Sequence, residues 1–261
     1  MDLNLEGKRA IVCGSTQGIG REIALQLAGL GASITLIARN EEKLKELLKQ
    51  LPKAAGTHDY LVADFSKIEE LKTQLEKYAP GKTDIQILIN NTGGPAPGKA
   101  SEAGLSEFTQ AFSQHLLCNQ LLTRAFLPSM KKNQYGRIIN IISTSVKEPI
   151  KGLGVSNTIR AAVANWAKTI SIELAPYGIT VNNILPGATA TSRLENIIKS
   201  NAEKKGISRE EIEKEMKSEI PVGRFASPAE VAAAAVFLCT PSASYINGIN
   251  LPVDGGRTGC L

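Results

Sequence analysis

Residues 9–20 read Arg9-Ala10-Ile11-Val12-Cys13-Gly14-Ser15-Thr16-Gln17-Gly18-Ile19-Gly20, an apolar run followed by a turn that contains three glycines. The apolar run, which is partly β-branched, predicts a buried strand that Gly14 ends. Beyond the glycines, apolar side chains recur at helical spacing and predict a helix over residues 21–30. A second apolar run at residues 33–38 predicts another strand. Residues 8–39 therefore predict a strand–helix–strand unit with the glycine turn at its first junction.

The glycine turn has the spacing Gly-x3-Gly-x-Gly rather than the commoner Gly-x-Gly-x-x-Gly. Glycine allows positive φ, lets the backbone come close to a pyrophosphate, and lets a helix pack closely on a strand. The N-terminus of the following helix also offers free N–H groups to an anion. A glycine-rich turn is often only a turn, but the strand and the helix on either side favour an anion-binding site here.

The bulk composition indicates one domain spanning residues 1–261. With 261 residues and 43% hydrophobic composition, the chain can bury one large core, and no Pro/Gly/Ser-rich linker divides it. Its formal net charge is +5, and no long block of one sign occurs. Dispersed lysines are typical of a solvated surface, so nucleic-acid binding is not favoured. A basic balance does suit an anionic cofactor or substrate.

The cysteines and histidines argue against a disulfide framework and against a metal site. Cys13, Cys118, Cys239 and Cys260 lie far apart without metal-ligand spacing, and the chain has only two histidines. We therefore expect reduced thiols in a cytoplasmic protein that binds no metal. Residues 1–6 do not resemble a signal peptide and no apolar run reaches the length of a membrane span, so we expect no membrane association.

Strand and helix patterns alternate along the rest of the chain. Helices are predicted at 41–51, 66–79, 104–131, 155–175 and 228–239, and strands at 57–63, 85–89, 137–142, 178–184 and 245–251. Residues 191–219 are polar and are also predicted to be helical. This alternation predicts an α/β fold, a single-domain Rossmann-type doubly wound parallel sheet covered by helices on both faces. In such sheets ligands bind outside the carboxyl ends of the strands.

A series of motifs stands at these strand ends and turns. They are Gly14-x3-Gly18-x-Gly20, Asn90-Asn91-Thr92-Gly93, residues 136–143 ending in Ser143, Pro186-Gly187, Pro221-Val222-Gly223-Arg224 and Asp254-Gly255-Gly256. Together and in this order they resemble the short-chain dehydrogenase/reductase family, and within it the 3-oxoacyl-acyl-carrier-protein reductases. The resemblance covers essentially the whole chain. It implies an oxidoreductase that uses a nicotinamide dinucleotide.

The resemblance also implies which residues bind this cofactor. They are Gly14, Ser15, Gly18, Ile19, Gly20, Asp64, Asn91, Arg160, Pro186, Gly187, Thr189 and Thr191. The glycine turn would line the pyrophosphate, Asp64 and Asn91 the adenosine half, and Arg160 a ribose. Thr189 and Thr191 would hold the carboxamide. Thr191 is equally suited to cap the following helix, and the two roles are compatible.

The end of the second strand distinguishes NAD(H) from NADP(H). An NAD site places an acid there to accept a hydrogen bond from the ribose 2′-hydroxyl, whereas an NADP site offers a cation. Here the sequence is Ala38-Arg39-Asn40, with no carboxylate before Glu41. Because arginine binds phosphate with two parallel hydrogen bonds, Arg39 predicts NADP(H). The alternative is an exposed arginine that merely ends a strand.

The family's chemistry uses an asparagine, a serine, a tyrosine and a lysine. Ser143 matches the serine, whereas the tyrosine and lysine positions fall on Ser156 and Arg160, and the asparagine position falls on His115. No tyrosine occurs between residues 136 and 176, and the Tyr-x3-Lys at residues 78–82 lies on the wrong element. The candidate catalytic residues are therefore Ser143, Ser156, Arg160 and His115.

Ser156 and Arg160 cannot act as a tyrosine–lysine pair acts. An aliphatic hydroxyl ionises far above the phenol value of ~10, and a serine is too short to reach the same point. Arg160 retains a cation that could hold a ribose, but a pKa above ~12 keeps it out of a proton relay. His115 is expected to exchange protons near neutrality, or else to be a hydrogen-bonded core residue.

Two readings of function follow, and a third is less favoured. The first is an NADP(H)-dependent oxidoreductase for a small carbonyl or hydroxyl compound, in which Ser143, a water molecule and His115 supply the proton. Residues 188–219 would then close over the substrate. The second is a catalytically inactive dinucleotide-binding protein, a sensor or a subunit. A nucleic-acid-binding or scaffold protein is the third, which the dispersed charge does not support.

The resemblance also implies a homo-oligomer, a dimer or a tetramer. Its interfaces would be built on the helices predicted at 104–131 and 155–175 and on the last helix and strand. Val163, Trp166 and Ile170 are the apolar candidates on the second of these helices. They could instead belong to the core alone.

Overall fold

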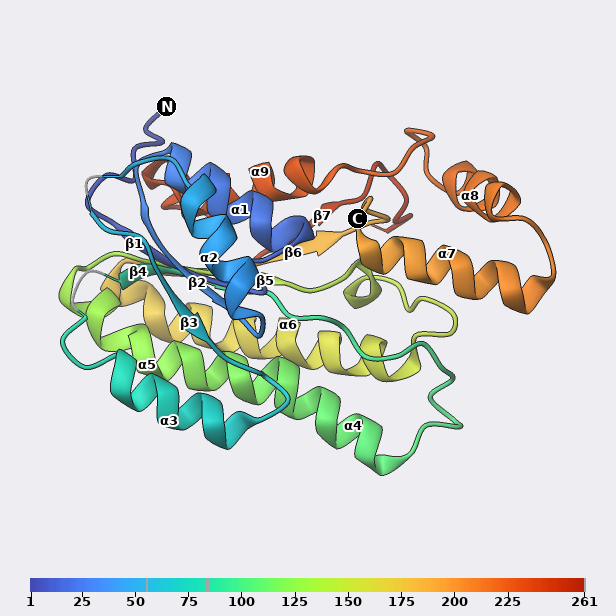
Figure 1. Ribbon diagram of the computed structural model, residues 1–261, viewed down its shortest axis with the longest axis horizontal. Helices are drawn as coiled ribbons and strands as arrows, with labels where there is room; N and C mark the ends of the chain where they lie inside the picture. Colours follow the sequence, from blue (N-terminus) through green and yellow to red (C-terminus); the bar gives the residue numbers. More distant parts are fainter. Residues whose placement is uncertain (55, 83–84, 261) are drawn as a thin grey trace.

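Seven parallel strands form one sheet in the part of the chain that the structure, a computed structural model, describes: residues 1–54, 56–82 and 85–260 (Figure 1). The strands are β1 Arg9–Cys13, β2 Ser33–Ala38, β3 Asp59–Val62, β4 Ile85–Asn90, β5 Gly136–Ile141, β6 Ile179–Pro186 and β7 Asn250–Val253. Their order in the sheet is β3-β2-β1-β4-β5-β6-β7. The order reverses between β1 and β4, which creates a ligand-binding crevice at their carboxyl ends. The predicted Rossmann-type doubly wound parallel sheet is confirmed.

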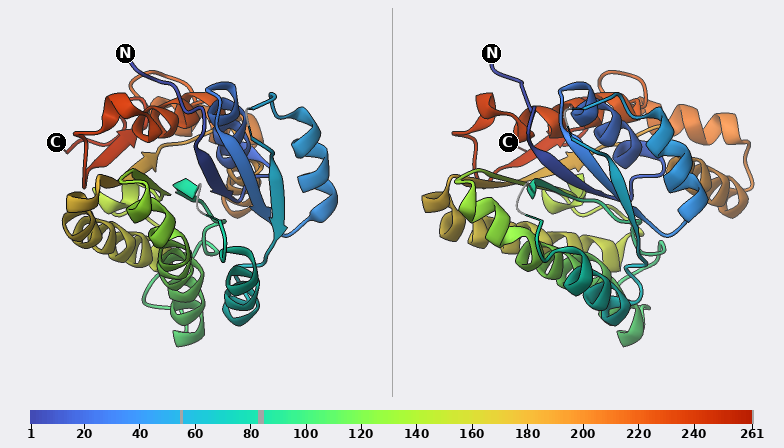
Figure 2. Two further views of the ribbon diagram at one scale, coloured as in Figure 1. Left: turned by 90° about the vertical axis from the view of Figure 1, so that its left-hand side faces the viewer. Right: turned by 60° about the vertical axis from the view of Figure 1, so that its left-hand side comes forward.

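Helices cover both faces of this sheet (Figures 1 and 2). The helices are α1 Gly18–Gly29, α2 Glu41–Gln50, α3 Ile68–Tyr78, α4 Leu105–Phe112, α5 Cys118–Lys132, α6 Gly154–Leu174, α7 Ser192–Lys205, α8 Arg209–Ser218 and α9 Pro228–Cys239. One face carries α1, α2 and α9, and the other carries α3, α5 and α6. The pair α7 and α8 projects beyond the carboxyl end of the sheet (Figure 1).

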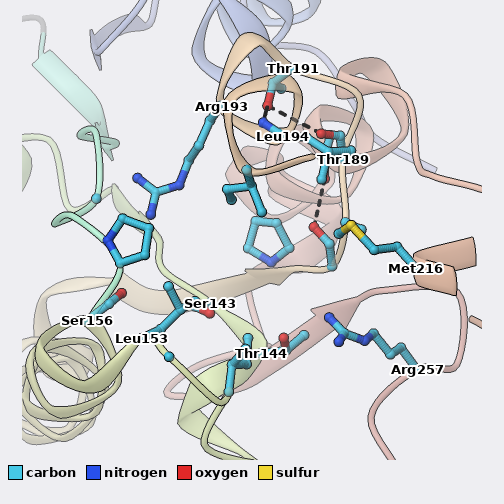
Figure 3. Close-up of a pocket in the computed structure, with 18 of the residues that line it drawn as sticks. Ser143, Thr144, Leu153, Ser156, Thr189, Thr191, Arg193, Leu194, Met216 and Arg257 are labelled. Atoms are coloured by element: carbon cyan, nitrogen blue, oxygen red, sulfur yellow. Dashed lines mark hydrogen bonds between the residues drawn. The ribbon is translucent and has the colours of Figure 1, made fainter. Parts of the chain in front are cut away.

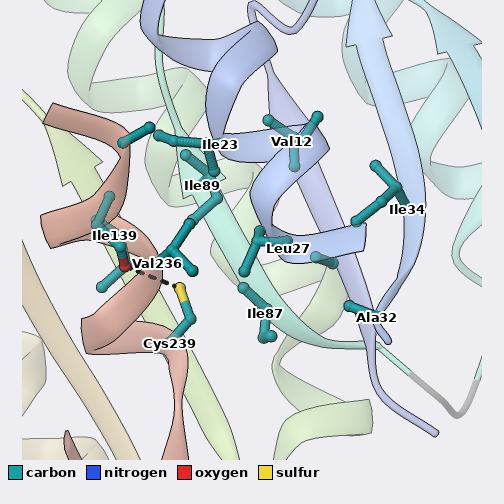
Figure 4. Packing of buried hydrophobic residues seen from close by; sticks show 14 of the residues in the cluster. Val12, Ile23, Leu27, Ala32, Ile34, Ile87, Ile89, Ile139, Val236 and Cys239 are labelled. Carbon is teal, nitrogen blue, oxygen red and sulfur yellow. Dashed lines mark hydrogen bonds between the residues drawn. The ribbon is translucent and has the colours of Figure 1, made fainter. Parts of the chain in front are cut away.

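The alternation of side chains along β1 explains why both faces are covered. Ala10 and Val12 pack into the cluster beneath α1 and α9, whereas Ile11 and Cys13 pack into the cluster beneath α5 and α6. All four are fully buried. Figure 4 shows the first cluster, in which Val12 lies among apolar side chains from α1, α9 and the neighbouring strands. A strand buried on both faces therefore reads as a continuous apolar run.

The helix predicted at 104–131 is interrupted, which the sequence pattern did not reveal. A π-helical segment, Ser113–Leu117, separates α4 from α5. Such segments insert an extra residue into a helical turn and are frequent at functional sites. Here the segment carries His115, a candidate catalytic residue.

The last strand lies later than predicted. Residues 245–249 precede β7, because Gly248 adopts a positive φ of 71° and the Asn247 side chain accepts a hydrogen bond from the Val181 N–H (2.9 Å). The apolar residues in this stretch thus form a turn against β6 rather than the start of a strand. The strand predicted at residues 57–63 is also shorter at both ends in the structure, where β3 spans Asp59–Val62.

Four asparagines form a hydrogen-bonded row across the sheet. Asn90 donates to Asn140 (2.8 Å), Asn140 to Asn183 (2.9 Å), and Asn183 to Asn250 (2.8 Å), so the row joins β4, β5, β6 and β7. Consecutive members are also register partners in the strand pairs. Because a buried amide without a partner is costly, the row favours this register over a slipped one.

The described residues contain neither a membrane-spanning helix nor a metal cluster. Across the described ranges, no helix is both long enough and apolar enough to cross a bilayer. The same ranges contain no group of His, Cys, Asp and Glu arranged to hold a metal ion. Cys13, Cys118 and Cys239 are buried and free, and Cys260 is exposed and free.

Candidate active site

Each of the three glycines in the turn after β1 is required for a structural reason. Gly14 and Gly18 adopt positive φ angles of 59° and 54°. Gly20 has an ordinary φ, but a Cβ there would lie 2.3 Å from the carbonyl oxygen of Gly14. Only glycine lets α1 start this close to the turn. The first turn of α1 contains no acidic residue, so its free N–H groups stay available to an anion.

Ser15 and Asn91 stabilise this turn from two sides. The Ser15 hydroxyl is fully buried and donates to the Ile37 carbonyl of β2 (3.4 Å). The Asn91 amide donates to the carbonyls of Cys13 (3.2 Å) and Gly14 (3.3 Å). Through these hydrogen bonds Asn91 stabilises the turn. Its contact with the adenine ribose stays a prediction.

Arg39 and Asp64 lie at the ends of β2 and β3, outside the main cavity. Arg39 is exposed, and no carboxylate of the described residues lies within ion-pair distance of it. Partial burial opposes ionisation of Asp64, but hydrogen bonds from Ser66 and the charges of Arg39 and Lys67 hold its pKa below the ordinary value. Arg39 is thus a cation that has an acid nearby without being bound to it.

A cavity of about 850 Å³ occupies the carboxyl end of the sheet (Figure 3). It is bordered by the start of α1, the ends of β4, β5 and β6, the start of α6, and the α7–α8 pair. Among the predicted site residues, those that line it are Ile19, Asn91, Ser143, Ser156, Arg160, Pro186, Gly187, Thr189 and Thr191. Gly14, Ser15, Gly18, Gly20, Arg39, Asp64 and His115 are not among its lining residues.

Ser143 and Ser156 lie on the same side of this cavity (Figure 3). Ser143 follows β5, and its Oγ accepts a hydrogen bond from the Ser145 N–H (3.1 Å). Its own hydroxyl proton is therefore available to a ligand. Ser156 is 5% exposed and lies in the first turn of α6. Both serines therefore present a hydroxyl to the cavity lining.

Arg160 lies one turn after Ser156 on α6 and is buried, at 7% exposed. Its Nη1 donates to the Ile141 carbonyl at the end of β5 (3.0 Å). Burial and then the charge of Arg193 lower the pKa of Arg160 to about 10. The value is lower than the sequence led us to expect, yet the side chain still carries its charge at neutral pH.

The prediction that His115 exchanges protons near neutrality is wrong. His115 is 1% exposed, and its Nδ1 lies 2.6 Å from Thr92 Oγ1. Its Nε2 has no hydrogen-bond partner among the described residues. Burial, followed by the charges of Arg160 and Arg193, lowers the pKa of His115 to about 2. The imidazole is therefore neutral at physiological pH and cannot act as an acid. The alternative, a buried histidine with a hydrogen bond, matches these contacts.

Thr189 and Thr191 shape the loop between β6 and α7. Thr189 Oγ1 donates to the Gly187 carbonyl (3.0 Å), and Thr191 Oγ1 donates to the Thr189 carbonyl (3.2 Å) (Figure 3). Thr191 Oγ1 also accepts from the Leu194 N–H and is the N-cap of α7. The capping role considered from the sequence is thus confirmed. It fixes where α7 leaves the sheet.

Arg193 is a site residue that the sequence reading missed. It is the second residue of α7, lines the cavity, and reaches back over the loop after β4. Its guanidinium lies so close to Gly94 that a Cβ there would be 2.5 Å from Nη1. Within the described part of the chain it makes one hydrogen bond, to the Pro95 carbonyl, which is long at 3.5 Å. The signal available in the sequence was a basic residue in the segment expected to close over a substrate.

A family model described as enoyl-(acyl carrier protein) reductase matches residues 14–258. This match spans the glycine turn, the cavity and the last strand. The chain belongs to the short-chain dehydrogenase/reductase family. The predicted resemblance is thereby confirmed, for the family and for the fold.

Two curated relatives of this chain are named as reductases. The NADPH-dependent reductase BacG of Bacillus subtilis is 34% identical over 253 residues, covering 95% of this chain and 97% of the relative. The 3-oxoacyl-[acyl-carrier-protein] reductase FabG of Aquifex aeolicus is 31% identical over 261 residues, covering 98% and 99%.

A solved short-chain dehydrogenase/reductase structure is also similar. L-sorbose reductase from Gluconobacter frateurii, complexed with NADPH and L-sorbose, matches with a TM-score of 0.92 and 30% identity, and each chain is covered completely, at 100%. The likeness therefore includes the α7–α8 region as well as the sheet.

Proposed function

We propose that this chain is an NADP(H)-dependent oxidoreductase that reduces the carbonyl group of a small molecule, similar in kind to the 3-oxoacyl-acyl-carrier-protein reductases. The observation that carries the proposal is the cavity, which Ile19 of α1 and Thr189 line together with Ser143, Ser156 and Arg160. A pocket that joins a dinucleotide-binding turn to paired hydroxyls and a buried cation suits hydride transfer to a carbonyl.

Several residues fit NADP(H). The space beside Gly20 that a Cβ would fill and the free N–H groups of α1 suit the pyrophosphate. Arg39 suits the 2′-phosphate, Asp64 the adenine edge, and Arg160 the ribose next to the nicotinamide. Thr189 and Thr191 would hold the carboxamide. When bound, NADPH would supply the hydride.

The protein's own part would be to bind and polarise the carbonyl oxygen. The Ser143 and Ser156 hydroxyls would donate hydrogen bonds to it, and the charge of Arg160 would stabilise the alkoxide that forms. A water molecule would supply the proton, because the neutral His115 cannot and because the pKa of Arg160, about 10, keeps its proton in place near pH 7. This is an altered form of the family's tyrosine–lysine chemistry.

The experiment that tests this function measures binding and turnover in parallel. NADPH should bind more tightly than NADH in a fluorescence titration. Arg39→Ala should lower the ratio of the two affinities by about 10- to 100-fold, which is the contribution of a charged hydrogen-bonded pair. Lys67→Ala is the matched control, since Lys67 also lies near Asp64 but is paired with Glu70 (3.0 Å). If NADPH and NADH bound equally well, and if Arg39→Ala changed neither affinity, the NADP(H) assignment would be rejected.

A second candidate is a catalytically inactive dinucleotide-binding protein, a sensor or a subunit. It is favoured by one observation: no tyrosine stands between residues 136 and 176. The same experiment separates the two candidates. Tight NADPH binding without NADPH oxidation across a panel of ketones, oxo esters and oxo acids would support the inactive protein.

We also propose a homo-oligomer, although not through the side chains singled out in the sequence. Val163 is fully buried in the core, and Trp166 and Ile170 are half-buried and pack against the core. Trp166 also donates to Gln120 of α5 (2.8 Å). The exposed apolar residue on α6 is Ile172, which is 67% exposed. Phe112 and Leu117 add apolar surface beside α5.

Light scattering at micromolar concentration should therefore report a dimer or tetramer of the 27.8 kDa chain. Ile172→Glu should shift the mass toward the monomer, because a charge would then be buried at the interface. Thr169→Glu, at an exposed polar position of the same helix, should leave the mass unchanged. A native monomer would rule out the assembly.

A further inference from the structure

Some of the charged residues around the cavity form ion pairs and others do not. Arg257 is bound to Glu219 (2.6 Å), and Lys205 is bound to Glu215. Arg160 and Arg193 line the same cavity, yet within residues 1–54, 56–82 and 85–260 no carboxylate lies within ion-pair distance of either. The remaining acid of the lining, Glu148, is exposed. The cavity lining therefore carries two guanidinium groups without a counter-ion among these residues, that of Arg160 buried and that of Arg193 exposed.

The charge of Arg193 acts on the neighbouring buried groups. Burial first, and then the charge of Arg193, lowers the pKa of Arg160; burial, followed by the charges of both arginines, lowers the pKa of His115. Like charges near one another, one of them buried, raise the free energy of the folded state unless an anion neutralises them. Arg193 has five N–H donors and, among the residues that the structure describes, a single long bond to the Pro95 carbonyl, so most of its donors stay free for a ligand.

The position of Arg193 favours the substrate over the cofactor as the source of that anion. The pyrophosphate already has the start of α1, and the 2′-phosphate has Arg39. In Figure 3 the Arg193 side chain descends from α7 into the cavity, on the side where Ser143, Leu153 and Ser156 lie. These are the residues that would surround the substrate carbonyl, not the phosphates.

We propose that Arg193 binds a carboxylate on the substrate, so that the substrates are oxo acids with a free carboxylate. This inference rests on the proposed function, because it assigns the substrate class of the same site. The reaction would convert an oxo acid, NADPH and a proton into the hydroxy acid and NADP⁺. Arginine is suited to this role because its planar donors match the two carboxylate oxygens. An acyl thioester presents no such charge.

The test compares acids with their own neutral esters. The probes are 2-oxobutanoate, acetoacetate and levulinate, in which the carbonyl lies progressively further from the carboxylate, and the methyl ester of each. Binding to the NADP⁺-bound protein is measured by calorimetry, and turnover by NADPH oxidation. At least one acid should be preferred over its ester by about 10- to 100-fold, the range for a charged hydrogen-bonded pair.

Variants of Arg193 identify the residue responsible. Arg193→Gln should abolish the preference for the acid while leaving NADPH affinity intact, and Arg193→Lys should restore part of it. Lys199→Gln removes an exposed charge from the same helix, outside the cavity lining, and should change neither quantity.

The outcomes separate this inference from the proposed function. Acids that bind in an Arg193-dependent way without NADPH oxidation would uphold the ligand class and count against a reductase. Esters reduced as well as acids would overturn the inference and leave the reductase standing. Loss of NADPH affinity in Arg193→Gln would also overturn it, because the arginine would then serve the cofactor's phosphates. Failure of every acid to bind would overturn it as well.

Discussion

Gly20→Ala is expected to lower the affinity for NADPH by at least about 100-fold, to the point where a fluorescence titration no longer saturates. A Cβ at this position would lie 2.3 Å from the carbonyl oxygen of Gly14 and 2.6 Å from the Asn91 amide nitrogen. The Gly14 carbonyl is backbone and Asn91 is bound to it, so neither can move without opening the turn. A turn opened in this way no longer presents the start of α1 to a pyrophosphate.

The matched control is Gly29→Ala, the same substitution in the same helix. A Cβ at Gly29 would meet nothing within 4 Å, and the helical position should gain about 0.5–1 kcal/mol from the alanine. Urea unfolding of both variants separates binding from stability, since the overpacked Gly20→Ala should also lose about 1–3 kcal/mol. Native NADPH affinity in a folded Gly20→Ala protein would show that the glycine turn is not the pyrophosphate site.

The double variant Ser156→Tyr with Arg160→Lys is expected to reduce ketones about 10²- to 10³-fold faster than the native protein, the worth of one positioned donor at a developing oxyanion. The two positions are one helical turn apart on α6 and both line the cavity, so the new side chains would share a face. A phenol activated by a neighbouring lysine can give its proton to the alkoxide, whereas serine cannot. NADPH oxidation over a ketone panel measures the gain.

Ser156→Phe with Arg160→Lys is the control for this gain. It places the same ring in the cavity without the hydroxyl, so its rate should stay at or below the native rate. A native protein that already turns over a substrate rapidly, combined with a slower double variant, would contradict our account of the site. The native centre would then support fast proton transfer without the tyrosine–lysine pair, and it would be a rebuilt site rather than an impaired one.

Much of the fold could be predicted from the sequence because its signals are local. The apolar run before Gly14, the glycine spacing and the helical pattern after it each concern neighbouring residues. The convergence of Ser143, Thr189 and Thr191 on one cavity was also predictable, since parallel strands end at the same edge of the sheet. Even the cap at Thr191 is a property of one turn of chain.

The protonation state of His115, the position of Arg193 and the asparagine row were decided only by the tertiary structure. The sequence determined that a histidine is present, but its proton affinity depends on burial and on two arginines that lie far along the chain. In the same way, Arg193 became a candidate ligand only because folding places it over Gly94 without a carboxylate partner. A local pattern determines which elements form. The charge and the hydrogen-bonding capacity of a site depend instead on which distant side chains exclude water from it, and the packed fold alone decides that.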